Sequence, residues 1–241
     1  MDGFLILSIE TASSCGSVSL TTGCGESFYL LAECNSQPDV THSRRLLGSI
    51  DWLMNTVGTG WSDLDGIAIS LGPGSFTGLR IGMAAAKSIA MAAGKPLIGV
   101  PTLDALALNV SVNDRLLCCL LDARKQQVYA GFYRTDENGL PRRISDPVAV
   151  SPAGLTKGLD EPVLLIGSGT RVYRDILLKN DLIKIVPEYL STPRASLVGQ
   201  LAGEMLAAGR TLDPASAVPI YVRASEAEVN LKRRQALEIT R

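Results

Sequence analysis

The sequence contains a single histidine, His42, so it offers few groups for acid–base chemistry. A Ser-His-Asp or Cys-His catalytic arrangement would have to use this one side chain, yet no Gly-x-Ser-x-Gly turn surrounds any serine. No HExxH or HxxxH pair is present, so the sequence cannot supply a two-histidine metal site. His42 stands directly before a periodic apolar segment, which favours a residue beside a helix N-terminus over a ligand or a base.

The cysteines indicate neither a disulfide framework nor a zinc site. Their number is odd and no CxxC pair occurs among them. Cys118 and Cys119 stand within an apolar run, which is more typical of packing residues than of reactive thiols. We therefore expect no metal and no cofactor. The five cysteines are Cys15, Cys24, Cys34, Cys118 and Cys119.

The glycine-rich segment from Ser70 to Gly82, SLGPGSFTGLRIG, lies where a predicted strand turns into a predicted helix. Unpaired N–H groups at such a helix start can bind an anion. However, the segment lacks the Gly-Lys-Ser/Thr of a Walker A loop, and its glycines do not follow the dinucleotide spacing Gly-x-Gly-x-x-Gly. Phosphate binding here is therefore the weaker interpretation.

The helix that follows carries a stripe of very small residues, one at every fourth position. Such a stripe lets another element approach closely. It could pack on the chain's own sheet or on a helix over residues 46–57, or it could meet another protein. If it meets a partner, adding bulk at Gly82 should abolish binding. The stripe consists of Gly78, Gly82, Ala86, Ala90 and Gly94.

The hydrophobic pattern predicts the elements that position these residues, in the order β-β-β-α-β-α-β-α over the first half of the chain. The expected segments are 4–9, 17–22, 27–32, 46–57, 66–71, 76–93, 97–100 and 102–109. The opening then recurs, with a strand over 116–121 and a returning strand over 128–133. Glu10 and Asp122 follow the first strand of each copy, so we infer a weak internal duplication. Further strands are expected over 146–150, 163–166 and 183–186, and helices from 152, through 176 and over 194–208.

Composition and length indicate a folded protein with two related α/β units, 1–110 and 111–241, the second ending in a charged, mobile tail after Tyr221. Of the 241 residues, 46% are apolar and 20% are charged, which excludes a disordered chain. A net charge of −1 argues against a broad phosphate-binding surface, and Lys232 to Arg234 are more typical of a solvent-exposed tail than of an RNA-binding site. No secretory signal or membrane span is apparent, so we expect a cytoplasmic protein.

Six segments carry distinctive motifs: Ile9–Ala12, His42–Leu47, Gly72–Gly82, Gly99–Leu103, Asp122–Arg124 and Pro219–Arg223. Together they resemble the TsaB (YeaZ) family, the accessory subunits of bacterial tRNA threonylcarbamoyladenosine synthesis. The resemblance spans most of the first 135 residues in the family's order, and the glycine block is its most specific part. It implies a duplicated actin/Hsp70-like ATPase fold (ASKHA, RNase H-like) with two related α/β subdomains.

The resemblance also implies a function and partners. Family members act with a TsaD-type catalytic subunit and a TsaE-type ATPase to place a threonylcarbamoyl group on N6 of adenosine 37 in tRNA (t6A37). The resemblance thus predicts a non-catalytic subunit that scaffolds and activates the TsaD-type paralogue. It also predicts a homodimer when the chain is alone, and contact with tRNA only through the complex.

The two hairpins favour a non-catalytic role over an enzymatic one. Glu10 is followed by Thr11-Ala12-Ser13-Ser14 and Asp122 by Ala123-Arg124-Lys125, where an ATPase of this fold would want glycines beside the phosphates. We therefore expect no catalytic residues and little or no nucleotide binding. The alternative is an independent ASKHA-fold kinase, which should bind magnesium ATP, or a peptidase acting on its TsaD-type partner.

By the resemblance, the partner surface lies on two helices of the first half, residues 43–57 and 76–93. The pattern leaves open which face of each helix meets the partner. The predicted interface residues are Leu46, Leu47, Ile50, Leu53, Gly78, Gly82, Ala86 and Ala90.

Overall fold

The computed structural model describes residues 3–36, 42–111 and 114–222. The basic residues Lys232 to Arg234, and Arg223 of the closing motif, lie outside this part of the chain. No helix among the described residues is both long enough and apolar enough to cross a membrane.

The first half forms a five-stranded sheet in the order β3-β2-β1-β4-β5. β1, β2 and β3 form an antiparallel meander, as the sequence predicts, while β4 and β5 run parallel to β1. β1 and β4 are central strands that are buried on both faces, including their polar residues Ser8, Glu10 and Ser70. The strands are β1 (Ile6–Glu10), β2 (Gly16–Thr22), β3 (Tyr29–Ser36), β4 (Gly66–Gly72) and β5 (Leu97–Pro101).

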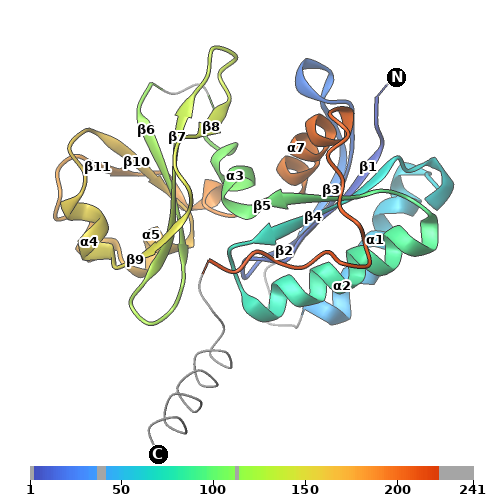
Figure 1. Cartoon of the computed structure of the whole chain (residues 1–241), viewed down its shortest axis with the longest axis horizontal. Coiled ribbons are helices and arrows are strands. Elements are labelled where there is room, and N and C mark those ends of the chain that lie inside the picture. Colours follow the sequence, from blue (N-terminus) through green and yellow to red (C-terminus); the bar gives the residue numbers. More distant parts are fainter. Residues whose placement is uncertain (1–2, 37–41, 112–113, 223–241) are drawn as a thin grey trace, which may run out of the picture.

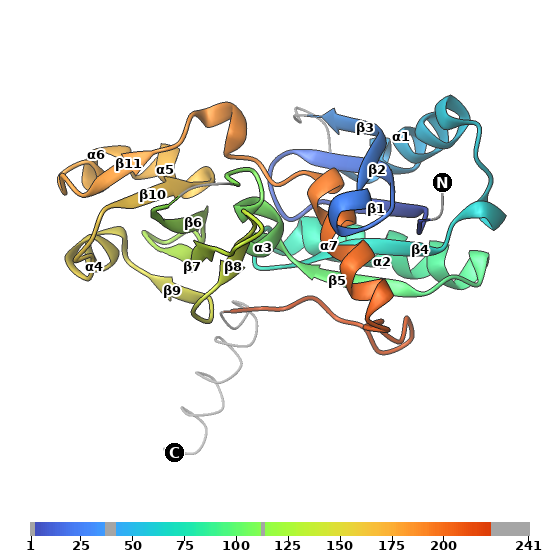
Figure 2. The same cartoon turned by 90° about the horizontal axis from the view of Figure 1, so that it is seen from above.

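Helices cover both faces of this sheet (Figures 1 and 2). α1 (His42–Val57) and α2 (Phe76–Ala93) pack on one face, where Leu7 and Ile9 of β1 point. α7 (Ala195–Ala207) packs on the other face, where Ile6 points. Because side chains alternate along a strand, one apolar strand supplies both cores.

The second half repeats this arrangement in a six-stranded sheet with the order β11-β10-β6-β7-β8, in which β9 also pairs with β7. β6 pairs antiparallel with β7 and parallel with β10, just as β1 pairs with β2 and β4. This shared topology confirms the predicted duplication. The strands are β6 (Leu116–Asp122), β7 (Val128–Thr135), β8 (Pro141–Arg143), β9 (Val148–Val150), β10 (Val163–Ile166) and β11 (Ile183–Ile185). Short helices accompany them: α4 (Pro152–Lys157), α5 (Ser168–Val172) and α6 (Arg174–Leu177), with a 3-10 turn at Glu188–Leu190. The first half has 3-10 turns at Gly25–Ser27 and Trp61–Asp63.

The last helix of each half in sequence packs on the sheet of the other half. α3 (Thr102–Ala107) follows β5, yet its Leu103 and Leu106 pack with Leu117 and Tyr133 of the second sheet. α7 follows the second sheet but packs on the first, and the chain then continues along β5, where Leu212 bridges Leu97. Residue 110, where the sequence predicts the change of unit, lies between β5 of the first sheet and β6 of the second. α7 and Leu212, which that prediction places in the second unit, pack on the first sheet.

Candidate functional site

A cleft lies between the two halves, where β1 and β6 end. Its cavity of about 370 Å³ is lined by Ser13 and Ser14 from the first hairpin, Ser75 from the start of α2, and Asp122 and Arg124 from the second hairpin. The duplication therefore brings the two hairpins together, although they are about half a chain apart in sequence. Of the two acids that the sequence singles out, Asp122 lines the cavity and Glu10 does not.

Glu10 is fully buried and serves the turn that follows it. Its carboxylate accepts hydrogen bonds from the Ala12 N–H at 2.6 Å and from the Ser13 hydroxyl at 3.1 Å. Burial raises the pKa of Glu10 to about 8, because desolvation of the charged form outweighs these two hydrogen bonds. These are the contacts of a structural cap, so this carboxyl is not presented to a ligand.

The raised pKa of Glu10 gives stability a defined pH dependence. Between the ordinary carboxyl pKa of 4.5 and about 8, the folded chain holds a proton that the unfolded chain has lost, so the free energy of unfolding falls as pH rises through this window. Glu10→Gln cannot ionise. Its amide oxygen still accepts from the Ala12 N–H, while its NH2 group takes the place of the oxygen that accepts from the Ser13 hydroxyl and faces that hydroxyl as a donor. As pH rises through this window, the free energy of unfolding of the variant, measured with urea, should increase relative to that of the wild type by at most about 1.4 kcal/mol for each pH unit. Identical pH profiles would contradict this; Glu26→Gln, at an exposed position, is the control.

Three residues of the second hairpin that carry long side chains have an unusual backbone conformation. Arg124, Lys125 and Gln126 have φ angles of +61°, +50° and +58°, a region that favours glycine. Asp122 accepts hydrogen bonds from the Arg124 N–H at 2.9 Å and from the Tyr173 hydroxyl at 3.2 Å. The Asp122 carboxylate is thus held by the protein itself.

The glycine-rich segment packs against the first hairpin. A Cβ at Gly74 would overlap the carbonyl oxygen of Ala12, and a Cβ at Gly78 would overlap that of Thr11. The Ser75 N–H donates to the Ala12 carbonyl at 2.6 Å, and the Gly78 N–H donates to the Ser75 hydroxyl at 3.2 Å. Two donors at the start of α2 are thereby used within the chain, and the glycines serve close packing.

The predicted interface residues are mostly buried within the chain. On α2, the small-residue stripe faces the first sheet and the first hairpin: Thr11 donates its hydroxyl to the Gly78 carbonyl at 2.8 Å, and a Cβ at Gly82 would press on Thr11 and Ile69. On α1, Leu47 is the exposed member, with 62% of its surface accessible. The seven buried members of the prediction are Leu46, Ile50, Leu53, Gly78, Gly82, Ala86 and Ala90.

Other residues of the same two helices point outward, and we call these residues the outer helix face. Gly48 lies in the middle of α1, and no other described part of the chain lies within 4 Å of where its Cβ would be. Trp52 and Met91 are 54% and 66% exposed. This face combines small residues with large apolar ones. The prediction missed it because it followed the small-residue stripe, which lies on the buried side of α2. The outer helix face consists of Leu47, Gly48, Asp51, Trp52, Asn55, Thr77, Ala84, Ser88, Met91 and Ala92.

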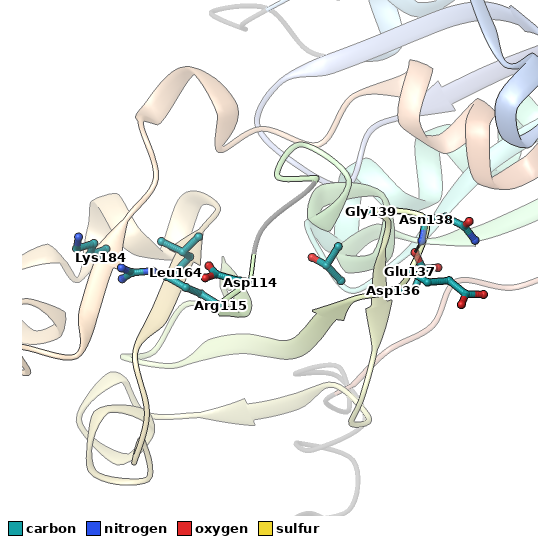
Figure 3. Close-up of a pocket in the computed structure, with 9 residues that line it drawn as sticks. Asp114, Arg115, Asp136, Glu137, Asn138, Gly139, Leu164 and Lys184 are labelled. Carbon is teal, nitrogen blue, oxygen red and sulfur yellow. Dashed lines mark hydrogen bonds between the residues drawn. The ribbon is translucent and has the colours of Figure 1, made fainter.

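Two larger hollows on the second half mix charges of both signs. A hollow of about 980 Å³ at the end of the second sheet has Arg115 and Lys184 on one side and Asp136 and Glu137 on the other (Figure 3). A second hollow, of about 1010 Å³, contains Arg171 paired with Glu188 at 3.1 Å. Neither hollow favours a ligand of one charge.

Cys118 and Cys119 lie in the core of the second sheet, as the apolar run around them predicts. Cys118 and Cys119 are fully buried, and burial raises the pKa of both thiols well above the usual range, so they remain protonated packing groups. Within residues 3–36, 42–111 and 114–222, no three His, Cys, Asp or Glu side chains come together as a metal site would need. His42 is the first residue of α1.

Comparison with known proteins gives consistent matches. The family model TsaD, tRNA N6-adenosine threonylcarbamoyltransferase, matches residues 37–231. The tRNA threonylcarbamoyladenosine biosynthesis protein TsaB of Escherichia coli K12 is 31% identical over 225 residues, covering 90% of this chain and 94% of that protein. TsaB of Bacillus subtilis is 33% identical over 206 residues, covering 83% and 87%. The structure of YeaZ from Pseudomonas aeruginosa is similar with a TM-score of 0.76 and 25% identity, over 90% of this chain and 99% of YeaZ.

Proposed function

Because the chain belongs to the TsaB (YeaZ) family of t6A biosynthesis proteins and has the duplicated actin/Hsp70-like (ASKHA) fold, we propose that it is a non-catalytic subunit required for t6A37 formation in tRNA. It scaffolds and activates a TsaD-type catalytic paralogue, together with a TsaE-type ATPase. The observation that carries this proposal is a likeness extending over 94% of the E. coli TsaB protein.

The cleft supports the absence of catalysis in this subunit. Glu10 is buried and binds the backbone of its own turn, and Asp122 is held by Arg124 and Tyr173. Side chains at Arg124 and Lys125 stand where glycine would leave space for the backbone to approach a phosphate. The architecture of a phosphotransfer enzyme is retained without the open hairpins that such an enzyme uses.

The outer helix face supports docking of the TsaD-type partner. A glycine inside a helix costs about 1 kcal/mol relative to alanine. At Gly48, no contact with the described part of the chain offsets this cost. Ala84 and Ser88 are also small and exposed, so a partner helix could approach closely. Leu47 and Met91, which are 62% and 66% exposed, would gain burial in such a contact.

We place the other partners relative to the same face. In the absence of the TsaD-type subunit, the outer helix face joins two copies of this chain in a homodimer. The TsaD-type subunit then binds this face in place of the second copy. Contact with tRNA arises only through the complex, in the cytoplasm. The net charge of −1 supports this assignment, because the chain has no excess of basic residues for binding RNA alone.

Size-exclusion chromatography with light scattering tests the docking. We expect the chain alone to elute as a dimer, and an equimolar mixture with a TsaD-type protein to elute as a one-to-one complex. Separate elution at micromolar concentrations would contradict the proposal. Calorimetry with magnesium ATP addresses the kinase alternative, since tight binding to the isolated chain would favour it. Cleavage of the TsaD-type protein in the mixture would favour the peptidase alternative.

A further inference from the structure

Residues 211–222, the last segment that the structure describes, form a strap that lies along α2 and the edge strand β5 (Figure 2). The strap is fixed by its backbone. The Leu212 N–H donates to the Leu97 carbonyl and the Ile220 N–H to the Leu71 carbonyl, both at 2.8 Å. The Lys87 ammonium on α2 donates to the Ala217 carbonyl at 3.0 Å. This segment therefore has a defined position beside α2.

Leu212 packs on the first core, but the side chains of the strap from Ala217 onward show the reverse of the usual burial pattern. Ala217, a small residue, is buried in the first core with 9% of its surface accessible. The larger Val218, Ile220 and Tyr221 are 70%, 46% and 39% exposed. A segment that served only to stabilise this fold would turn its largest apolar side chains inward, because burial of apolar area is the main favourable term.

These exposed residues continue onto α2. The Tyr221 ring lies 5.4 Å from the Phe76 ring, measured between centroids, and Phe76 is itself 41% exposed. The Arg80 guanidinium lies 4.0 Å from the Phe76 centroid and donates to the Tyr221 hydroxyl at 3.3 Å. Among the described residues, no carboxylate pairs with Arg80. We call Phe76, Arg80, Val218, Ile220 and Tyr221 the strap patch.

We infer that the strap patch extends the docking surface for the TsaD-type subunit and receives an apolar segment of it that carries a carboxylate for Arg80. This inference rests on the proposed function. α2 lies between α1 and the strap, so the patch continues the outer helix face along its other side (Figures 1 and 2). A clustered apolar patch with a cation that has no carboxylate partner among residues 3–36, 42–111 and 114–222 suits an acidic, apolar occupant. A second copy fits less well, since a two-fold contact centred on the patch would bring the two Arg80 side chains together.

The test is the affinity of the full chain for a TsaD-type protein, measured by calorimetry. We expect the double variant Val218→Asp with Ile220→Asp to raise the Kd by about 30-fold or more while leaving the melting temperature close to that of the wild type, because both side chains are exposed. Ile144→Asp with Ile176→Asp is the matched control, at 55% and 38% exposure in the second half, and should leave the Kd unchanged.

The outcomes separate this inference from the proposed function. An unchanged Kd for the strap variant, with binding lost in Gly48→Leu, would overturn the strap patch alone. Loss of homodimerisation with an unchanged Kd for the TsaD-type protein would assign the patch to a second copy and would also overturn the inference. An Arg80→Glu variant that binds the TsaD-type protein as tightly as the wild type would contradict the inference that the bound segment carries a carboxylate for Arg80.

Discussion

Gly78→Ala is expected to destabilise the fold strongly, by about 3 kcal/mol or more in the free energy of unfolding measured with urea. The added methyl group would overlap the Thr11 carbonyl, a backbone atom that cannot rotate away. The hydrogen bond from the Thr11 hydroxyl to the Gly78 carbonyl, at 2.8 Å, holds the two segments at this separation. The junction between the first hairpin and α2 should therefore open.

Gly48→Ala is the matched control for this variant, and it should change the free energy of unfolding in the opposite direction. The same substitution in α1 meets open space, so the gain in helix propensity should raise stability by about 0.5–1 kcal/mol. If both variants were equally stable, the close packing of α2 on Thr11 would be refuted. For the same reason, bulk at Gly82 tests the fold and not the partner surface, because Gly82 contacts Thr11 and Ile69.

Gly48→Leu is expected to abolish binding to a TsaD-type protein without loss of stability. The leucine would project from the outer helix face at the point where we propose that the partner comes closest, and the Kd measured by calorimetry should rise by about 30-fold or more. Ala207→Leu, at an exposed position of α7, is the control and should bind normally. A Gly48→Leu variant with wild-type affinity would exclude α1 from the interface.

Much of the first half was predictable because its pattern is local. The period of Leu46, Ile50 and Leu53 correctly gives α1, and the apolar run before Glu10 correctly gives β1. β3 extends beyond its predicted end to Ser36 because pairing with β2 continues through polar residues. β8 was missed because Pro141 and its basic neighbours carry no apolar signal. Pairing with β7 alone defines that strand.

The site was less predictable because it depends on contacts distant in sequence. Spacing shows that Gly78 and Gly82 share a face, but their neighbour, Thr11, is 67 residues before Gly78. The side of α2 that faces the sheet could not be read from a period in which Ala84, Ser88 and Ala92 also recur every fourth residue. The exchange of α3 and α7 between halves likewise has no local signature.

The amount of t6A formed in tRNA tests the central claim most directly. A TsaD-type and a TsaE-type protein would be incubated with substrates and unmodified tRNA, with and without this chain, and the nucleosides quantified by mass spectrometry. We expect t6A only when the chain is present, with Glu10→Gln as active as the wild type and Gly48→Leu inactive. Full t6A formation without the chain, or t6A formation by the chain alone, would contradict a non-catalytic subunit that acts by docking.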